Sequence, residues 1–142
     1  MQRTTRHIAP APLLRVGLAI DAAGSGAVGL AHVAVTGALA QLMAVPTALI
    51  LGSGLFMLTY AATLVVLARS TTLPRGLVRF IVVGNSAYVA GCLLLALLVP
   101  NLNVYAVAHL VLQALAVTGL VVLQARGLAQ SRPADSTRMR LA

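Results

Sequence analysis

Four long apolar stretches constrain this chain more than any other feature of its sequence. They run over about residues 13–36, 46–68, 77–99 and 103–125. Each is long enough to cross a bilayer as a helix, which takes about 20 mainly apolar residues. The apolar runs are continuous and do not alternate with polar residues, which disfavours a transmembrane β-barrel. We therefore predict an all-α fold, a compact four-helix transmembrane bundle.

Arginine sets the expected orientation of the four spans. The chain has ten Lys+Arg against two Asp+Glu, and all ten basic residues are arginine. They lie before or at the start of the first span, around the loop between the second and third spans, and after the fourth span. Because basic residues favour the cytoplasmic side, both termini are predicted to be cytoplasmic. The arginines are expected to contact anionic lipid headgroups there, and no nucleic-acid partner is predicted.

The chain divides into three parts. Residues 1–12 form a basic cytoplasmic N-terminus, and residues 13–126 form the membrane domain. Residues 127–142 lack apolar periodicity and are predicted to be a disordered basic tail. The composition is rich in Ala, Leu, Val and Arg, which suggests a GC-rich bacterial genome. The expected location is therefore the bacterial inner membrane.

Asp21 is the main candidate for a chemical site, because it is the one acidic residue inside a predicted span. An ionisable residue is costly in the hydrocarbon core and is a functional hypothesis by default. Counting along the spans places Tyr60, Asn85 and Thr118 at about the same depth. If these faces converge, Asp21 accepts hydrogen bonds from Asn85 and Tyr60, or it is protonated because burial disfavours its charge. We interpret this layer as a structural one, in which interhelical hydrogen bonds stabilise the bundle, with a proton, ion or substrate site as the alternative.

A second polar cluster is predicted nearer the outer side of the membrane. Tyr105, His109 and Gln113 follow an i, i+4, i+8 spacing, so they share one stripe of the fourth span. His32 of the first span lies at a similar depth. We interpret the four as hydrogen-bonding residues and predict no resident metal or cofactor. Two histidines from two helices can also ligate a haem iron, which remains the alternative.

Small residues predict where helices approach closely, since they let backbones touch. The residues singled out for helix packing are Ala22, Ser25, Gly26, Gly29, Gly52, Gly54, Ala87 and Gly91. The first and third spans are therefore expected to be central in the bundle or to lie at a self-association interface.

The two halves of the chain suggest a parallel duplication of a two-span unit. Arg15 is followed six residues later by Asp21, and Arg79 is followed six residues later by Asn85. In a duplicated fold, Asp21 and Asn85 would face each other across a pseudo-two-fold axis along the membrane normal.

Two resemblances concern the first span. It opens with Leu-Arg-Val-Gly-Leu-Ala-Ile-Asp-Ala-Ala-Gly-Ser-Gly over residues 14–26, and later spans carry Tyr60-Ala61 and Asn85 close to Tyr88. In these features the chain resembles small, poorly characterised four-span bacterial integral membrane proteins, a resemblance that implies no activity. An acidic residue in the first span is also a feature of small multidrug resistance transporters. That match fails because those carriers use glutamate in a different context and their dual-topology members need a weak charge bias.

The short loops and the lack of a catalytic constellation favour a non-enzymatic protein. We interpret the chain as an accessory or scaffold subunit of a homo-oligomer or a larger membrane complex. One alternative is a small oligomeric proton-coupled transporter that uses Asp21. The other is a haem-binding electron carrier that uses His32 and His109.

Overall fold

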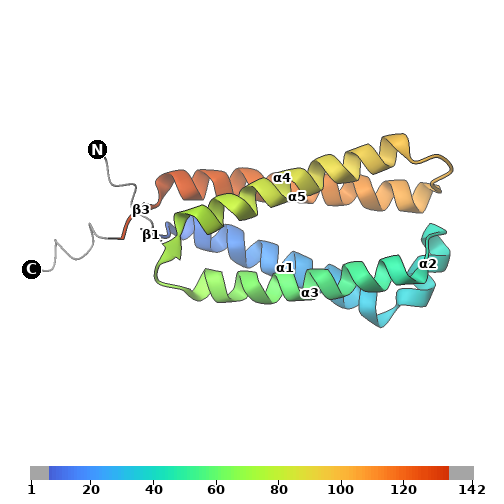
Figure 1. The fold of residues 1–142 in the computed structure, drawn as a ribbon, viewed down its shortest axis with the longest axis horizontal. Coiled ribbons are helices and arrows are strands. Elements are labelled where there is room, and N and C mark those ends of the chain that lie inside the picture. The colour runs from blue at the N-terminus through green and yellow to red at the C-terminus, as the bar shows by residue number, and fades with distance from the viewer. Residues whose placement is uncertain (1–6, 135–142) are drawn as a thin grey trace, which may run out of the picture.

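The four predicted spans are four long helices in the computed structural model, which describes residues 7–134. These helices are α1 (Pro12–Ala34), α3 (Thr47–Arg69), α4 (Arg75–Leu98) and α5 (Val104–Gln130). Each is long and apolar enough to cross a membrane (Figure 1). The prediction of an all-α four-helix bundle is confirmed.

Helix α1 is the centre of the bundle. It packs against α3 on one side and against α5 on another, while α4 packs mainly against α5. Helices α3 and α4 scarcely touch each other, so the bundle consists of an α1–α3 pair and an α4–α5 pair joined through α1 and α5 (Figure 1). The sequence places the first and third spans either at the centre of the bundle or at a self-association interface; α1 is central, whereas α4 is not central within this chain. Helix α4 lies at the edge because its main packing partner is α5.

Seven of the eight predicted small residues divide into two groups, and the eighth, Ser25, hydrogen-bonds to Asp21. Gly29 and Gly54 lie where α1 and α3 cross, and a Cβ added to Gly54 would stand 2.8 Å from the Cβ of His32 and 3.0 Å from the carbonyl oxygen of Gly29. Ala22 is buried, and a Cβ on Gly26 would be in ordinary contact with α3. The other group does not pack within the chain. A Cβ on Gly52 or Gly91 would meet nothing within 4 Å, and Ala87 is exposed.

Three very short strands tie the segments at one end of the bundle together. They are β1 (His7–Ala9), β2 (Leu73–Pro74) and β3 (Arg132–Pro133). β1 lies between the other two and pairs antiparallel with both, and its Ile8 is completely buried. The segment before α1, the α3–α4 loop and the segment after α5 therefore form one cap over this end.

The described chain is ordered beyond the predicted start of the tail. Helix α5 continues to Gln130, and β3 follows it, so residues 127–134 are ordered where a disordered tail was expected. The cause is packing: Gly127 lies against the start of α1, and the Ser131 hydroxyl accepts a hydrogen bond from the Ala11 backbone at 3.0 Å. Residues 135–142, which hold the rest of the predicted tail, and residues 1–6 lie outside the described part of the chain.

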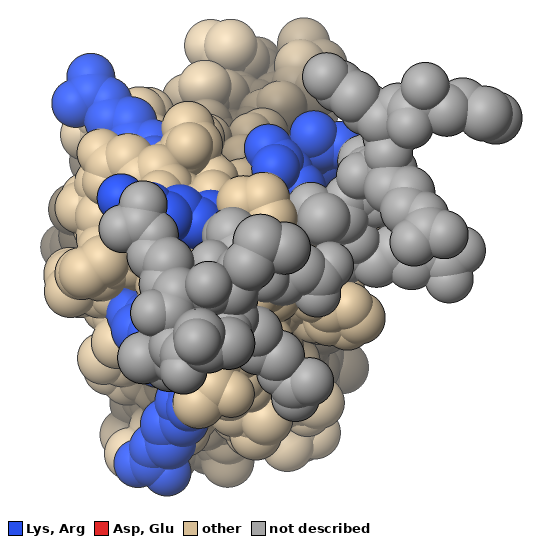
Figure 2. Space-filling view, turned by 90° about the vertical axis from the view of Figure 1, so that its left-hand side faces the viewer, with Lys and Arg blue, Asp and Glu red and all other residues tan. Residues whose placement is uncertain are grey.

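The same end carries the arginines of the described chain, and we call it the arginine end. They are Arg15, Arg69, Arg75, Arg79, Arg126 and Arg132. Figure 2 views this end and shows several basic side chains and no acidic one among the described residues on the visible face. The described arginines, which come from three separate segments of the sequence, thus gather at one end of the molecule (Figure 2).

The opposite end contains a helix that was not predicted. Helix α2 (Thr36–Met43) occupies part of the segment expected to be a loop, and it ends at Ala44 with a φ of 54°. Asn103 joins it to α5: the Asn103 amide nitrogen donates to the Leu42 carbonyl at 2.7 Å, and its side-chain oxygen accepts from the Ala106 backbone at 2.9 Å. One side chain thus caps α5 and holds α2 in place.

Candidate functional site

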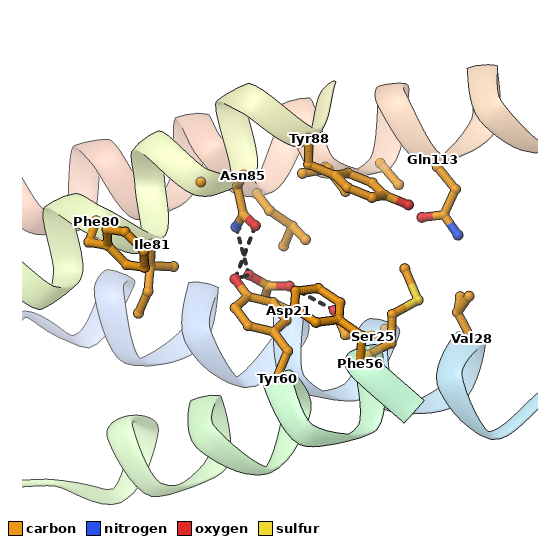
Figure 3. Close-up of a pocket in the computed structure, with 16 residues that line it drawn as sticks. Asp21, Ser25, Val28, Phe56, Tyr60, Phe80, Ile81, Asn85, Tyr88 and Gln113 are labelled. Carbon is orange, nitrogen blue, oxygen red and sulfur yellow. Dashed lines mark hydrogen bonds between the residues drawn. The ribbon is translucent and has the colours of Figure 1, made fainter. Parts of the chain in front are cut away.

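The carboxyl group of Asp21 is a meeting point of all four long helices. Asp21 lies on α1 and is only 2% exposed. Its Oδ2 accepts from the Gln124 amide of α5 at 2.7 Å, from the Asn85 amide of α4 at 2.8 Å and from the Tyr60 hydroxyl of α3 at 3.1 Å. Its Oδ1 accepts from the Ser25 hydroxyl of α1 at 3.1 Å (Figure 3). The buried carboxyl group therefore holds the two helix pairs together.

The partners of Asp21 also bond to one another. The Tyr60 hydroxyl is 3.0 Å from the Asn85 side-chain oxygen, and the Asn85 amide donates to the Gln124 side-chain oxygen at 3.1 Å. A hydroxyl has one hydrogen, so Tyr60 donates either to Asp21 or to Asn85. When Oδ2 of Asp21 carries a proton, the Tyr60 oxygen can accept it while Tyr60 donates to Asn85. The hydroxyl hydrogens of this network therefore have acceptors in both protonation states of Asp21.

Three of the four residues predicted for this layer come together, and the fourth does not. Thr118 is exposed, and its hydroxyl donates to the Ala114 carbonyl of its own helix at 2.7 Å. Gln124, which was not predicted, takes its place. The prediction counted seven residues back from an expected helix end at 125, whereas α5 ends at Gln130. The same count from residue 130 leads to residue 123, next to Gln124.

Asp21 has no arginine partner among residues 7–134. The nearest arginine along its helix, Arg15, donates instead to the Ala68 carbonyl at 3.3 Å, at the arginine end. The groups that face Asp21 are a hydroxyl on α1, a phenol on α3 and amides on α4 and α5. Among the described residues, Tyr60 is thus the one titratable side chain that hydrogen-bonds to Asp21.

Asp21 lies in the wall of a cavity of about 560 Å³ that all four long helices line. The wall is otherwise mostly apolar, with Val28, Met57 and Leu120 among its residues. Phe56 of α3 and Phe80 of α4 also line it, yet they are 68% and 73% exposed. Because these two exposed rings lie on α3 and α4, which scarcely touch each other, the cavity is open to the side of the bundle between these helices.

The predicted outer polar cluster is divided in the structure. His32 and His109 come together, with their ring centroids 5.4 Å apart and their planes tilted by 40°. Gln113 lines the cavity instead, and Tyr105 is exposed. Tyr105, His109 and Gln113 therefore face three different surroundings, although they follow the spacing of one helix face.

Ser53 contacts both His32 and its own helix. The Ser53 hydroxyl lies 2.9 Å from the Ile50 carbonyl and 2.8 Å from His32 Nδ1. The hydroxyl has one hydrogen, so Nδ1 donates to Ser53 when Ser53 donates to Ile50, and accepts from Ser53 otherwise. Neither histidine lines the cavity beside Asp21, so that space is not a haem pocket between them. Residues 7–134 contain no group of three or more His, Cys, Asp or Glu that would hold a metal ion.

Comparisons of the chain with protein-family models, with curated proteins and with solved structures found no match. The residues that line the cavity therefore provide the evidence for its chemistry. These residues provide one carboxyl group, several aromatic rings and an otherwise apolar wall.

Proposed function

We propose that this multi-pass membrane protein is a small proton-coupled carrier. In this proposal it binds a membrane-soluble molecule in the cavity and couples that binding to the protonation of Asp21. One observation carries the proposal: the sole acidic residue of the four spans is buried in the wall of an apolar cavity. Apolar cavities with a few polar groups are typical ligand sites, and carboxyl groups at membrane depth are typical of proton and ion pathways.

The hydrogen-bond network provides a means of coupling. Helices α3 and α4 scarcely touch, and the Tyr60–Asn85 bond is one of the few links between them. Protonation of Asp21 changes which atom Tyr60 donates to, and so changes the bonds that join α4 to the α1–α3 pair. A ligand that binds more tightly to one protonation state of Asp21 raises the population of that state and lowers that of the other.

An accessory or scaffold role, in a homo-oligomer or a larger membrane complex, is the second candidate. Ala87 and Gly91 favour it, because these small residues of α4 face away from this chain and permit close approach of another helix. The exposed hydroxyls do not require such a partner. Those of Thr59, Ser86 and Thr118 donate to carbonyls of their own helices, which satisfies them in lipid. Recovery of a crosslinked complex from intact membranes would favour the accessory role.

The arginine end is proposed to face the bacterial cytoplasm and its anionic headgroups. The test starts from a chain in which the buried Cys92, the one cysteine, is replaced by Ser. A membrane-impermeant maleimide applied to intact cells should label Pro100→Cys, at the α2 end, and should leave Thr72→Cys, at the arginine end, unlabelled until the membrane is permeabilised. The reverse pattern would refute the orientation.

Infrared spectroscopy tests the proton site directly. As the pH around the wild-type chain reconstituted in lipid is lowered, we expect the C=O band of a protonated carboxylic acid to appear. Asp21→Asn should abolish this band. Asp135→Asn is the matched control, because Asp135 is the other acidic residue of the chain, and it should leave the band of Asp21 unchanged. A wild-type spectrum with no titrating band that depends on Asp21 would refute the proposed function.

A further inference from the structure

Four of the five aromatic side chains in this chain line the cavity that contains Asp21. The chain has three Tyr, two Phe and no Trp, and the lining includes Phe56, Tyr60, Phe80 and Tyr88. They come from α3 and α4, the helices on the two sides of the opening, and the Phe56 and Tyr60 rings stack with centroids 6.4 Å apart. Trp and Tyr of membrane proteins usually mark the two interfaces, whereas these four rings line the cavity whose wall contains the Asp21 carboxyl group. The faces of aromatic rings attract cations.

The Asp21 carboxyl group has room for a cationic partner on the side of the cavity. Oδ2 accepts from the Asn85 and Gln124 amides, and also from Tyr60 when that hydroxyl is not turned to Asn85, whereas among the described residues Oδ1 accepts only from Ser25, which also lines the cavity. A carboxylate oxygen has about two acceptor positions, so Oδ1 keeps one free. In the described chain Asp21 is not paired with an arginine. A buried ion is costly without a counter-charge, and a positively charged ligand would supply one.

The route into the cavity also favours a ligand dissolved in the bilayer. Phe56 and Phe80 form an apolar rim at the opening between α3 and α4, on the long side of the bundle. The arginine end presents basic side chains (Figure 2), which repel a cation that approaches along the bundle axis. A cation with enough apolar surface to partition into lipid avoids this barrier.

From these three observations we infer that the cavity binds a lipophilic organic cation, which enters between α3 and α4 and displaces the proton of Asp21. The apolar body of the cation lies among the aromatic rings, and its positive charge is balanced by the carboxylate. This inference rests on the proposed function and names its substrate class.

Two ions of the same shape and opposite charge test the inference: tetraphenylphosphonium and tetraphenylborate. Equilibrium binding to the purified full chain should be saturable for the phosphonium and not for the borate. Below the midpoint of the Asp21 infrared band, the apparent Kd for the phosphonium should rise about tenfold for each unit by which the pH is lowered, because one proton competes with one cation. Asp21→Asn should weaken binding at least about tenfold and remove its pH dependence.

The aromatic lining has its own matched control. Phe80→Leu keeps an apolar side chain but removes the ring, and it should raise the Kd about fivefold. Tyr105→Leu removes the aromatic residue that lies outside the cavity and should leave the Kd unchanged. Equal effects of these two variants, or pH-independent phosphonium binding that survives Asp21→Asn, would overturn the inference. An Asp21 band that titrates in a chain that binds no phosphonium would refute the substrate class and leave the proton site standing, whereas a missing band would refute the proposed function itself.

Discussion

Asp21→Leu is expected to lower the free energy of unfolding by about 2–4 kcal/mol, whereas Asp21→Asn should lower it by less than about 1 kcal/mol. Leucine removes the acceptor of three interhelical hydrogen bonds, which leaves amide hydrogens of Asn85 and Gln124 buried without partners. Asparagine keeps an oxygen at the position of Oδ2, and its amide group can donate to the Ser25 hydroxyl. Unfolding of the reconstituted or detergent-solubilised chain, followed by circular dichroism, measures both values.

Thr118→Val is the matched control for Asp21→Leu. It also removes a polar group at membrane depth, but Thr118 is exposed and bonds only to its own helix. We expect a change within about 0.5 kcal/mol. If Asp21→Leu proved as harmless as Thr118→Val, the network would not hold the helix pairs together. Asp21→Asn remains folded in this account, and so separates the proton site from the structural role of the network.

Gly127→Ala is expected to destabilise the chain by about 3 kcal/mol, at the upper end of the range for overpacking. A Cβ at Gly127 would lie 2.5 Å from the backbone nitrogen of Leu14 and 2.6 Å from its Cα. These atoms belong to the α1 backbone, so no side chain can turn away to relieve the clash. Helix α5 must then move from α1, and Gln124, one turn earlier on α5, must move with it. The unfolding transition should fall, and the infrared band of Asp21 should shift.

Gly119→Ala is the control on the same helix. A Cβ at Gly119 would meet nothing within 4 Å, so the added methyl group causes no clash. Alanine is a better helix former than glycine, by about 1 kcal/mol in a helix interior, so this variant should be neutral or more stable. Similar losses of stability from Gly127→Ala and Gly119→Ala would contradict the close contact of α1 with α5.

The four helices and part of the candidate site could be predicted from the sequence. Apolar length alone predicts the spans, because a bilayer demands about 20 residues from each helix. Depth counting brought Asp21, Tyr60 and Asn85 together, since their helices begin or end close to the predicted residues. It missed Gln124 because the end of α5 is set by the cap of short strands, which is a tertiary contact and leaves no hydropathy signal.

The cavity could not be predicted from the sequence, because it depends on the lack of close packing between α3 and α4. Asp21 and Asn85 are in contact, as the suggested duplication places them. A two-fold axis would relate α1 to α4 and α5 to α3. The contact between α1 and α5 would then be matched by an equal contact between α4 and α3. Helix α1 packs closely on α5, but α3 and α4 scarcely touch. The two halves therefore differ in packing, and this difference leaves the side of the bundle open beside Asp21.

The coupling of cavity and proton site is tested most directly by counting protons. Tetraphenylphosphonium is added to the purified chain in weakly buffered solution, at a pH below the midpoint of the Asp21 infrared band, and the released protons are measured with an indicator dye. The wild-type chain should release about one proton for each phosphonium ion bound, and Asp21→Asn should release none. Saturable phosphonium binding to the wild-type chain with no proton release would contradict the account.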